Sequence, residues 1–220
     1  SDVCSSDLSH AYLFTGTRGT GKTTCAKILA KAVNCEHPVN GDPCCQCPSC
    51  LGLESGSFLD VLELDAASNN GVDQVRALRD EAIYAPANVK KRVYIVDEVH
   101  MLSTAAFNAL LKILEEPPAH LMFILATTEL HKVPATILSR CQRYSFKRIL
   151  PKDIAQRLTY VAGQEHIDLT ADGAELLSRL ADGALRDGLS LLDQCAAAGG
   201  TVDSRAVLEV LGLAGNLQTA

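Results

Sequence analysis

The chain of 220 residues contains no apolar run that approaches the length of a membrane-spanning helix. Its first residues lack the basic flank and the apolar stretch of a secretory signal peptide. We therefore expect a cytoplasmic protein without a membrane partner. The chain also lacks an excess of basic residues, because its formal net charge is -6, which argues against a uniformly basic nucleic-acid-binding protein. No internal repeat or low-complexity tract is present.

The composition is otherwise that of a globular protein, with 47% hydrophobic and 21% charged residues. A chain of this length suffices for one large or two small domains, each with a buried core. Basic residues gather in one stretch, which contains Arg140, Arg143, Lys147, Arg148 and Lys152. The stretch is consistent with phosphate contact and equally with a solvated face, and the charge pattern leaves both open.

A glycine-rich segment near the N-terminus fits the pattern G-x-x-x-x-G-K-[ST]. It consists of Gly16, Thr17, Arg18, Gly19, Thr20, Gly21, Lys22 and Thr23, and we expect these residues and the following Thr24 to bind the nucleotide. Glycines permit positive φ, so that backbone N–H groups can turn inward and form an anion-binding nest at the start of the next helix. We expect Lys22 to reach the β- and γ-phosphates and the Thr23 hydroxyl to ligate Mg²⁺. The segment predicts an ATP or GTP site; the alternative is a glycine-rich surface turn.

A second segment, Arg92–Glu98, reads as a buried strand that ends in two carboxylates. Central parallel strands present such acids at their C-terminal edge. Asp97 would hold the Mg²⁺ shell, as the Walker B acid does in P-loop NTPases. Glu98 is placed to activate the attacking water as a general base. The alternative is a strand followed by a polar helix cap.

Five of the nine cysteines lie in one short segment that is poor in apolar residues, and four of them have regular spacing: Cys35, Cys44, Cys47 and Cys50. The spacing C-x8-C-x2-C-x2-C predicts a structural Zn²⁺ site, whose binding would order the segment and contribute roughly 10–16 kcal/mol. His37 and Cys45 lie near enough in sequence to replace a ligand. The alternative is a set of free or redox-active thiols, since disulfides do not suit a reducing cytosol.

Apolar runs predict strands at 11–14, 61–65, 92–96 and 121–126. Helical periodicity predicts helices at 25–33, at 103–114 with Ser103 as the cap, and around Val75, Leu78 and Ile83. This alternation predicts an α/β P-loop NTPase domain, with three layers and a parallel sheet. From Pro151 onward the pattern predicts only helices, at 154–161, 171–180, 185–197 and 204–211. We expect a P-loop domain at 1–148, with the cysteine insertion at 35–50, and a small all-helical lid domain at 149–220.

This arrangement resembles the AAA+ ATPases, and several strings resemble the gamma/tau subunits of the bacterial DNA polymerase III clamp loader. They are His10–Phe14 before the glycine loop, the four-cysteine insertion, Leu64–Ser68, Asp97–Leu102, Leu114–Pro118 and Ser139–Cys141. The resemblance covers residues 9–213, and the order and spacing of the strings are specific. It implies an AAA+ ATPase with ATP, Mg²⁺ and Zn²⁺ as cofactors.

The resemblance also implies roles that the residues alone do not indicate. Thr128 corresponds to sensor 1, which reads the γ-phosphate from the end of a strand. Arg140 corresponds to the arginine finger, which completes the ATP site of a neighbouring subunit in trans. Arg186 corresponds to sensor 2, which links the lid to the nucleotide. Without the resemblance, Arg140 and Arg186 would be interpreted as surface or ion-pair residues.

The implied function is that of an ATPase motor subunit in the DNA polymerase III holoenzyme, a DNA-directed DNA polymerase and so a transferase. Its implied partners are other clamp-loader subunits in a pentamer, the sliding clamp and primer-template DNA. The alternatives are a catalytically inactive clamp-loader subunit and another AAA+ DNA-processing ATPase, such as a branch-migration motor. A DNA-reading role for the cysteine module is disfavoured, because basic and aromatic residues are scarce there.

Two departures from the family pattern bear on this interpretation. Ser1–Leu8 does not resemble the longer family segment that helps to hold adenine, so adenine affinity is an open question. The collar domain that assembles the pentamer has no counterpart before Ala220. We therefore expect an N-terminal fragment of the family pattern. Because the implied arginine finger acts in trans, we also expect weak ATPase activity from the isolated chain.

Overall fold

The computed structural model describes residues 8–213 in two compact units. The first unit holds the described residues up to Gly16 and the range Lys22–Ser145. The second unit begins at Phe146, and the short loop Thr17–Gly21 groups with it. The expectations for the first seven and the last seven residues lie outside the described part of the chain.

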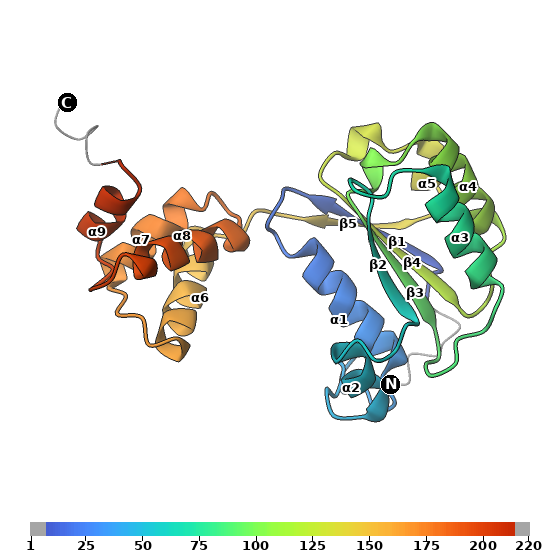
Figure 1. The fold of residues 1–220 in the computed structure, drawn as a ribbon, viewed down its shortest axis with the longest axis horizontal. Helices are drawn as coiled ribbons and strands as arrows, with labels where there is room; N and C mark the ends of the chain where they lie inside the picture. The colour runs from blue at the N-terminus through green and yellow to red at the C-terminus, as the bar shows by residue number, and fades with distance from the viewer. Residues whose placement is uncertain (1–7, 214–220) are drawn as a thin grey trace. The chain divides into compact units, whose positions relative to one another are not determined.

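A five-stranded sheet forms the centre of the first unit (Figure 1). Its strands are β1 (Ala11–Gly16), β2 (Val61–Asp65), β3 (Arg92–Asp97), β4 (Leu121–Thr127) and β5 (Gln142–Phe146), in the order β2-β3-β4-β1-β5. The pairings β2–β3, β3–β4 and β1–β4 are parallel. The parallel register brings Asp65 opposite Asp97 and Thr15 opposite Thr127, so the carboxyl ends of these strands meet at one edge. Every residue of β4 is buried, as expected for a strand covered on both faces.

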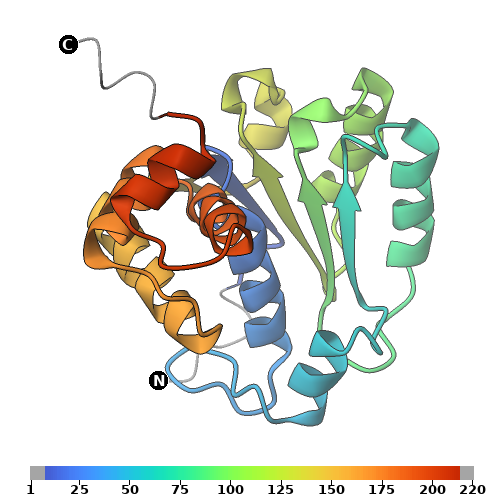
Figure 2. The ribbon, with the colours of Figure 1, turned by 60° about the vertical axis from the view of Figure 1, so that its left-hand side comes forward.

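Helices cover both faces of this sheet and complete the three layers (Figures 1 and 2). Helix α1 (Lys22–Asn34) lies on one face, and α3 (Val72–Ala82) and α4 (Thr104–Glu115) lie on the other. Ser103 caps α4 as predicted, because its side chain accepts a hydrogen bond from the Ala106 N–H at 3.2 Å. Short helical turns η1 (Val99–Met101), η2 (Leu130–Lys132) and α5 (Ala135–Leu138) follow the ends of β3 and β4.

Two elements and one helix end differ from the sequence-based expectation. Strand β5 was not predicted, because Gln142–Ser145 are exposed at the sheet edge and carry no apolar run. Helix α2 (Pro48–Glu54) was not predicted within the cysteine segment, where Pro48 occupies its first turn. Ile83 lies just after α3 and is 71% exposed, so the core face of that helix does not extend to it.

The second unit is helical and has its own core. It comprises α6 (Pro151–Gln164), α7 (Ala171–Leu180), α8 (Leu185–Ala197) and α9 (Ser204–Val210). Ile154, Leu158, Leu177, Leu192 and Val207 are fully or almost fully buried among these helices. The side chains of Thr170 and Asp203 cap α7 and α9, which explains where these helices begin. Within residues 8–213, no helix combines the length and the apolar character that crossing a membrane requires.

The buried side chain of Asn34 joins the end of α1 to the start of β3. Its Nδ2 donates to the carbonyls of Ala30 and Lys91, each at 3.0 Å, and its Oδ1 accepts from the Lys91 N–H at 2.7 Å. Because buried polar groups are costly when unpaired, this pairing fixes α1 against β3 at the end remote from the glycine loop.

Candidate functional site

The glycine loop has the backbone conformation that its sequence predicts. Gly16, Gly19 and Gly21 all have positive φ, at 148°, 75° and 92°. The Lys22 side chain is buried, and its Nζ donates to the Gly16 carbonyl at 2.9 Å, so the ammonium closes the loop from within. Burial lowers the pKa of Lys22, whereas the charges of Glu98 and Asp97 act in the opposite direction. An ammonium held among carboxylates at the start of a helix is suited to meet a polyphosphate.

Within the second unit, the loop residue Gly19 approaches the start of α8. Its carbonyl accepts from the Leu185 N–H at 3.1 Å, and a Cβ at Gly19 would lie 2.7 Å from the Ala184 Cβ and 3.6 Å from the Arg186 Cβ. Glycine is therefore required at this position for two reasons, its positive φ and this close approach. Thr17, Arg18, Thr24 and Arg186 are exposed, and Thr20 is buried with its Oγ1 donating to the Thr17 carbonyl at 2.8 Å.

The first helical turn of α1 and the end of β3 meet at Asp97. The Thr23 Oγ1 donates to Asp97 Oδ2 at 2.6 Å, and the Glu98 N–H donates to Asp97 Oδ1 at 2.9 Å. The two oxygens of one carboxylate thus fix the loop helix on one side and the next backbone turn on the other. A hydroxyl and a carboxylate at this separation are the oxygen donors that suit Mg²⁺ in P-loop enzymes.

Glu98 adopts a left-handed backbone conformation, with φ of 47° and ψ of 45°. A non-glycine residue there costs about 1–3 kcal/mol, and such strain is concentrated at functional sites. The Glu98 Oε2 accepts from the Thr128 N–H at 3.2 Å and from the Thr128 Oγ1 at 2.9 Å. The fold therefore brings Lys22, Thr23, Asp97, Glu98 and Thr128 together at the carboxyl ends of adjacent parallel strands.

One residue at this edge was missed by the sequence analysis. His100 lies in η1, its side chain is only 6% exposed, and its Nδ1 is 2.9 Å from Thr127 Oγ1 and 3.4 Å from Glu98 Oε2. The signal in the sequence was its position two residues after the second carboxylate of Arg92–Glu98. That position predicts proximity to the site but not the contact with the end of β4.

Arg140 forms hydrogen bonds with residues outside this cluster. Its Nη2 pairs with Glu115 Oε1 at 2.8 Å and its Nη1 donates to the Thr136 carbonyl at 2.8 Å. The Arg140 side chain is one-third exposed, so it remains accessible from solvent. This is the arrangement of a surface ion pair, and it is equally compatible with an arginine offered to another subunit.

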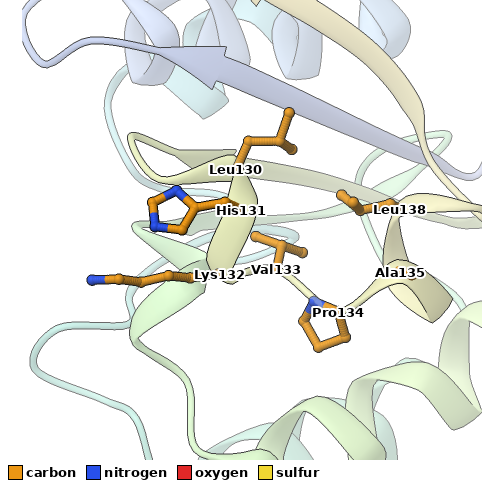
Figure 3. Close-up of a pocket in the computed structure, with 7 residues that line it drawn as sticks. All are labelled: Leu130, His131, Lys132, Val133, Pro134, Ala135 and Leu138. Carbon is orange, nitrogen blue, oxygen red and sulfur yellow. The ribbon is translucent and has the colours of Figure 1, made fainter.

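The segment between Thr128 and Arg140 lines a surface pocket (Figure 3). Its lining residues are Leu130, His131, Lys132, Val133, Pro134, Ala135 and Leu138. His131 and Lys132 extend to one side of it, and Pro134 and Leu138 lie on the other (Figure 3). Lys132 pairs with Glu129 at 2.6 Å, and this hydrogen bond is the main cause that lowers the pKa of Glu129.

The four predicted cysteines form one cluster. The Sγ atoms of Cys35, Cys44, Cys47 and Cys50 all lie within 4.8 Å of one another. The sulfurs of Cys35 and Cys47 are 4.0 Å apart, close to the edge of about 3.8 Å expected for sulfurs arranged tetrahedrally around zinc. His37 and Cys45 are exposed, and neither belongs to this cluster.

Backbone N–H groups support the thiolate form at three of the four sulfurs, whereas burial raises the pKa of Cys50. The N–H groups of Cys44, Cys47 and Cys50 point at the sulfurs of Cys35, Cys44 and Cys47, at 3.3, 3.3 and 3.4 Å. Hydrogen bonding, first from the Glu36 backbone, lowers the pKa of Cys47 to about 6. Four convergent soft donors, three of them with N–H support, fit a closed structural zinc site, in which these four side chains would hold the ion.

The fold and the phosphate loop define the chain as a P-loop protein with an AAA+ ATPase-like fold and a helical lid. A family model described as DNA polymerase III, delta subunit matches residues 1–150, and one described as DNA polymerase III clamp loader subunit, ATPase lid domain, matches residues 153–201. The chain therefore belongs to the DNA polymerase III clamp-loader family.

The curated relatives agree with this assignment. The chain is 56% identical over 195 residues to DNA polymerase III subunit tau of Bacillus subtilis and 49% identical over 206 residues to that of Escherichia coli. These alignments cover 89% and 93% of the chain but 35% and 32% of the relatives, so the chain spans about a third of their length. The resemblance to gamma/tau subunits that the sequence motifs indicated is confirmed.

Solved structures of Thermotoga maritima RuvB share the fold. The RuvB Holliday junction branch migration motor matches with a TM-score of 0.64 at 16% identity, covering 94% of this chain and 62% of that one. A mutant form of the same protein matches with a TM-score of 0.65, at the same identity and coverage. At this identity the likeness establishes the α/β domain with its helical lid and carries no further function.

Proposed function

We propose that the chain is an ATP-hydrolysing motor of the DNA polymerase III clamp loader. The observation that carries the proposal is the 2.6 Å contact between Thr23 and Asp97, which unites the glycine loop with the acid at the end of β3. In this proposal the backbone N–H groups of the loop and Lys22 bind the phosphates, and Arg186 contributes from the lid. The cofactors are ATP, Mg²⁺ and a structural Zn²⁺, and the compartment is the cytoplasm.

The chain's own residues divide the reaction between them. Thr23 and Asp97 would hold the magnesium ion, which when bound neutralises charge on the phosphate oxygens. Glu98 orients the attacking water and accepts its proton, and Thr128 fixes the direction of the Glu98 carboxylate. Because Thr128 has one hydroxyl proton, it cannot donate to Glu98 and to a phosphate oxygen at once. Contact of the Thr128 hydroxyl with a γ-phosphate would therefore break its hydrogen bond to Glu98, the proposed base.

Binding and hydrolysis would serve assembly on DNA. ATP can open a clamp or tighten a grip on primer-template DNA only to the extent that it prefers one state of the assembly. Arg140, accessible beside Glu115, would complete the site of a neighbouring subunit, so turnover would depend on correct assembly. The partners proposed are the other loader subunits in a pentamer, the sliding clamp and primed DNA.

The test compares binding with hydrolysis in three variants. We expect Lys22→Ala to lose most of its affinity for a labelled ATP analogue, and Glu98→Gln to bind it but to hydrolyse ATP about 100-fold more slowly. Lys27→Ala is the matched control, because Lys27 lies on the same helix but is exposed and pairs with Glu63. Binding unaffected by Lys22→Ala would refute the proposal. Binding without hydrolysis, in the presence of partner subunits, would favour the catalytically inactive loader subunit.

A further inference from the structure

His100 contacts Glu98, which follows the end of β3, and it contacts Thr127 and Glu129, which lie at and after the end of β4. Its side chain lies between Glu98, on its own turn, and Thr127, at the end of β4. The Nε2 atom faces Glu129 Oε1 at 3.8 Å. Such an imidazole joins two elements whose relative position decides where the carboxylate of Glu98 points.

The contacts around the ring fit either neutral tautomer of His100. Thr127 Oγ1 accepts from the Glu129 N–H at 3.0 Å and lies 2.9 Å from His100 Nδ1. Glu98 Oε2, an acceptor only, lies 3.4 Å from the same nitrogen. An Nδ1–H can donate to Thr127 Oγ1 and is attracted to Glu98 Oε2, whereas in the other tautomer the Thr127 hydroxyl donates to Nδ1 and the Nε2–H faces Glu129. A support of Glu98 by His100 requires the tautomer with the proton on Nδ1.

The contact between His100 and Glu98 involves a residue with a strained backbone. Glu98 is left-handed, and its carboxylate accepts two hydrogen bonds from Thr128 on one side. His100 Nδ1 also lies 3.4 Å from the same Glu98 oxygen and can support it a second time. The same nitrogen contacts Thr127, the neighbour of Thr128, and so links the end of β4 to the turn that carries Glu98. Two supports at different angles fix a carboxylate better than one, and displacement of a base by about 1 Å can cost on the order of 100-fold in rate.

We propose that His100 is a positioning residue for Glu98, acting through Nδ1 to fix the direction of the base without touching the nucleotide. The proposal rests on the function proposed above. It differs from a purely structural role, because it predicts that one particular nitrogen matters and that the rate changes while nucleotide affinity does not.

The test uses two amide side chains that differ in reach. Asparagine places its amide near the position of Nδ1, and glutamine places it near Nε2. We expect His100→Asn to keep the rate of ATP hydrolysis within about three-fold of the parent. We expect His100→Gln and His100→Leu to lower that rate by about 10- to 100-fold, with the dissociation constant for a labelled ATP analogue unchanged within about two-fold. His131→Asn is the matched control, because His131 also faces Glu129 but is 77% exposed.

Each outcome decides the question. Equal rates for His100→Asn and His100→Gln, or a rate loss that parallels a loss of ATP affinity, would overturn the positioning role. Failure of all three variants to fold would assign His100 to the structure alone and would equally overturn it. The rates are measured with partner subunits present. If the parent protein hydrolyses no ATP there, or if Glu98→Gln leaves its hydrolysis unchanged, the proposed function fails instead. The two failures are therefore distinguishable.

Discussion

The hydroxyl of Thr23 lies 2.6 Å from a carboxylate oxygen of Asp97, a residue 74 positions further along the chain. The first helical turn after the glycine loop and the end of β3 are joined by this contact. The relationship turns two separate sequence patterns into one site, because each supplies a different oxygen donor to the same region.

Substitution of Thr23 should distinguish the contribution of its hydroxyl to nucleotide binding from that of the loop backbone. We expect Thr23→Ala to weaken Mg²⁺-dependent binding of an ATP analogue by about 10-fold, because a ligand and the contact with Asp97 are both lost, and Thr23→Ser to restore it. Titration with and without Mg²⁺ measures the effect. Cys25→Ala, at an exposed position on the same helix, serves as the control. A Thr23→Ala protein with unchanged Mg²⁺ dependence would contradict the assignment.

Arg140 should act only in an assembly. We expect Arg140→Ala to leave ATP binding by the chain unchanged, while the ATPase rate of the assembled subunits falls by a factor on the order of 10³. Steady-state hydrolysis, measured for the chain alone and with partner subunits, checks this. Arg143→Ala, on exposed strand β5, controls for loss of a nearby charge. Rapid turnover by a dilute single chain that is insensitive to Arg140→Ala would disprove a role in trans.

The cysteine cluster should bind one metal ion. We expect freshly purified reduced protein to contain about one equivalent of zinc, which Cys47→Ser or Cys50→Ser removes with a loss of thermal stability. Elemental analysis and thermal unfolding are the measurements. Cys45→Ser is the control, since Cys45 is exposed and lies outside the cluster. Protein that contains no zinc, yet unfolds at the same temperature after Cys50→Ser, would rule out the metal site.

Stability of the helical unit should depend on pH through Asp172. Hydrogen bonds, first from the Ser204 side chain and then from Thr170, hold the pKa of Asp172 well below its ordinary value of 3.8. The folded state therefore favours the carboxylate: the stabilisation is fully present above about pH 4 and is lost as the pH falls through the lower, folded-state pKa.

We accordingly expect Asp172→Asn to lower the free energy of unfolding at pH 7, with the difference from the parent shrinking below about pH 4. Denaturant unfolding at several pH values measures this. Asp193→Asn, on an exposed position of α8, controls for the change in net charge. A difference that is independent of pH between pH 2 and pH 7 would exclude Asp172 as its source.

Much of the candidate site could be predicted from short sequence motifs. The glycine loop was predicted because only certain residues permit its backbone, and Gly16, Gly19 and Gly21 have the expected positive φ. Asp97 and Glu98 were predicted at a strand end because a continuous apolar run stops there. The cysteine cluster followed from its spacing. The roles of Thr128, Arg140 and Arg186 came from family resemblance and stay predictions.

The sequence by itself determined the buried strands, the helices with a clear apolar period, the phosphate loop and the four clustered cysteines, since each depends on residues that are close in the chain. Only the tertiary structure decided the contacts of Glu98 with Thr128 and of His100 with Thr127, together with the exposed edge strand β5. These depend on how strands distant in sequence align in the sheet. Register between parallel strands is set by packing across the whole core, which no local pattern encodes.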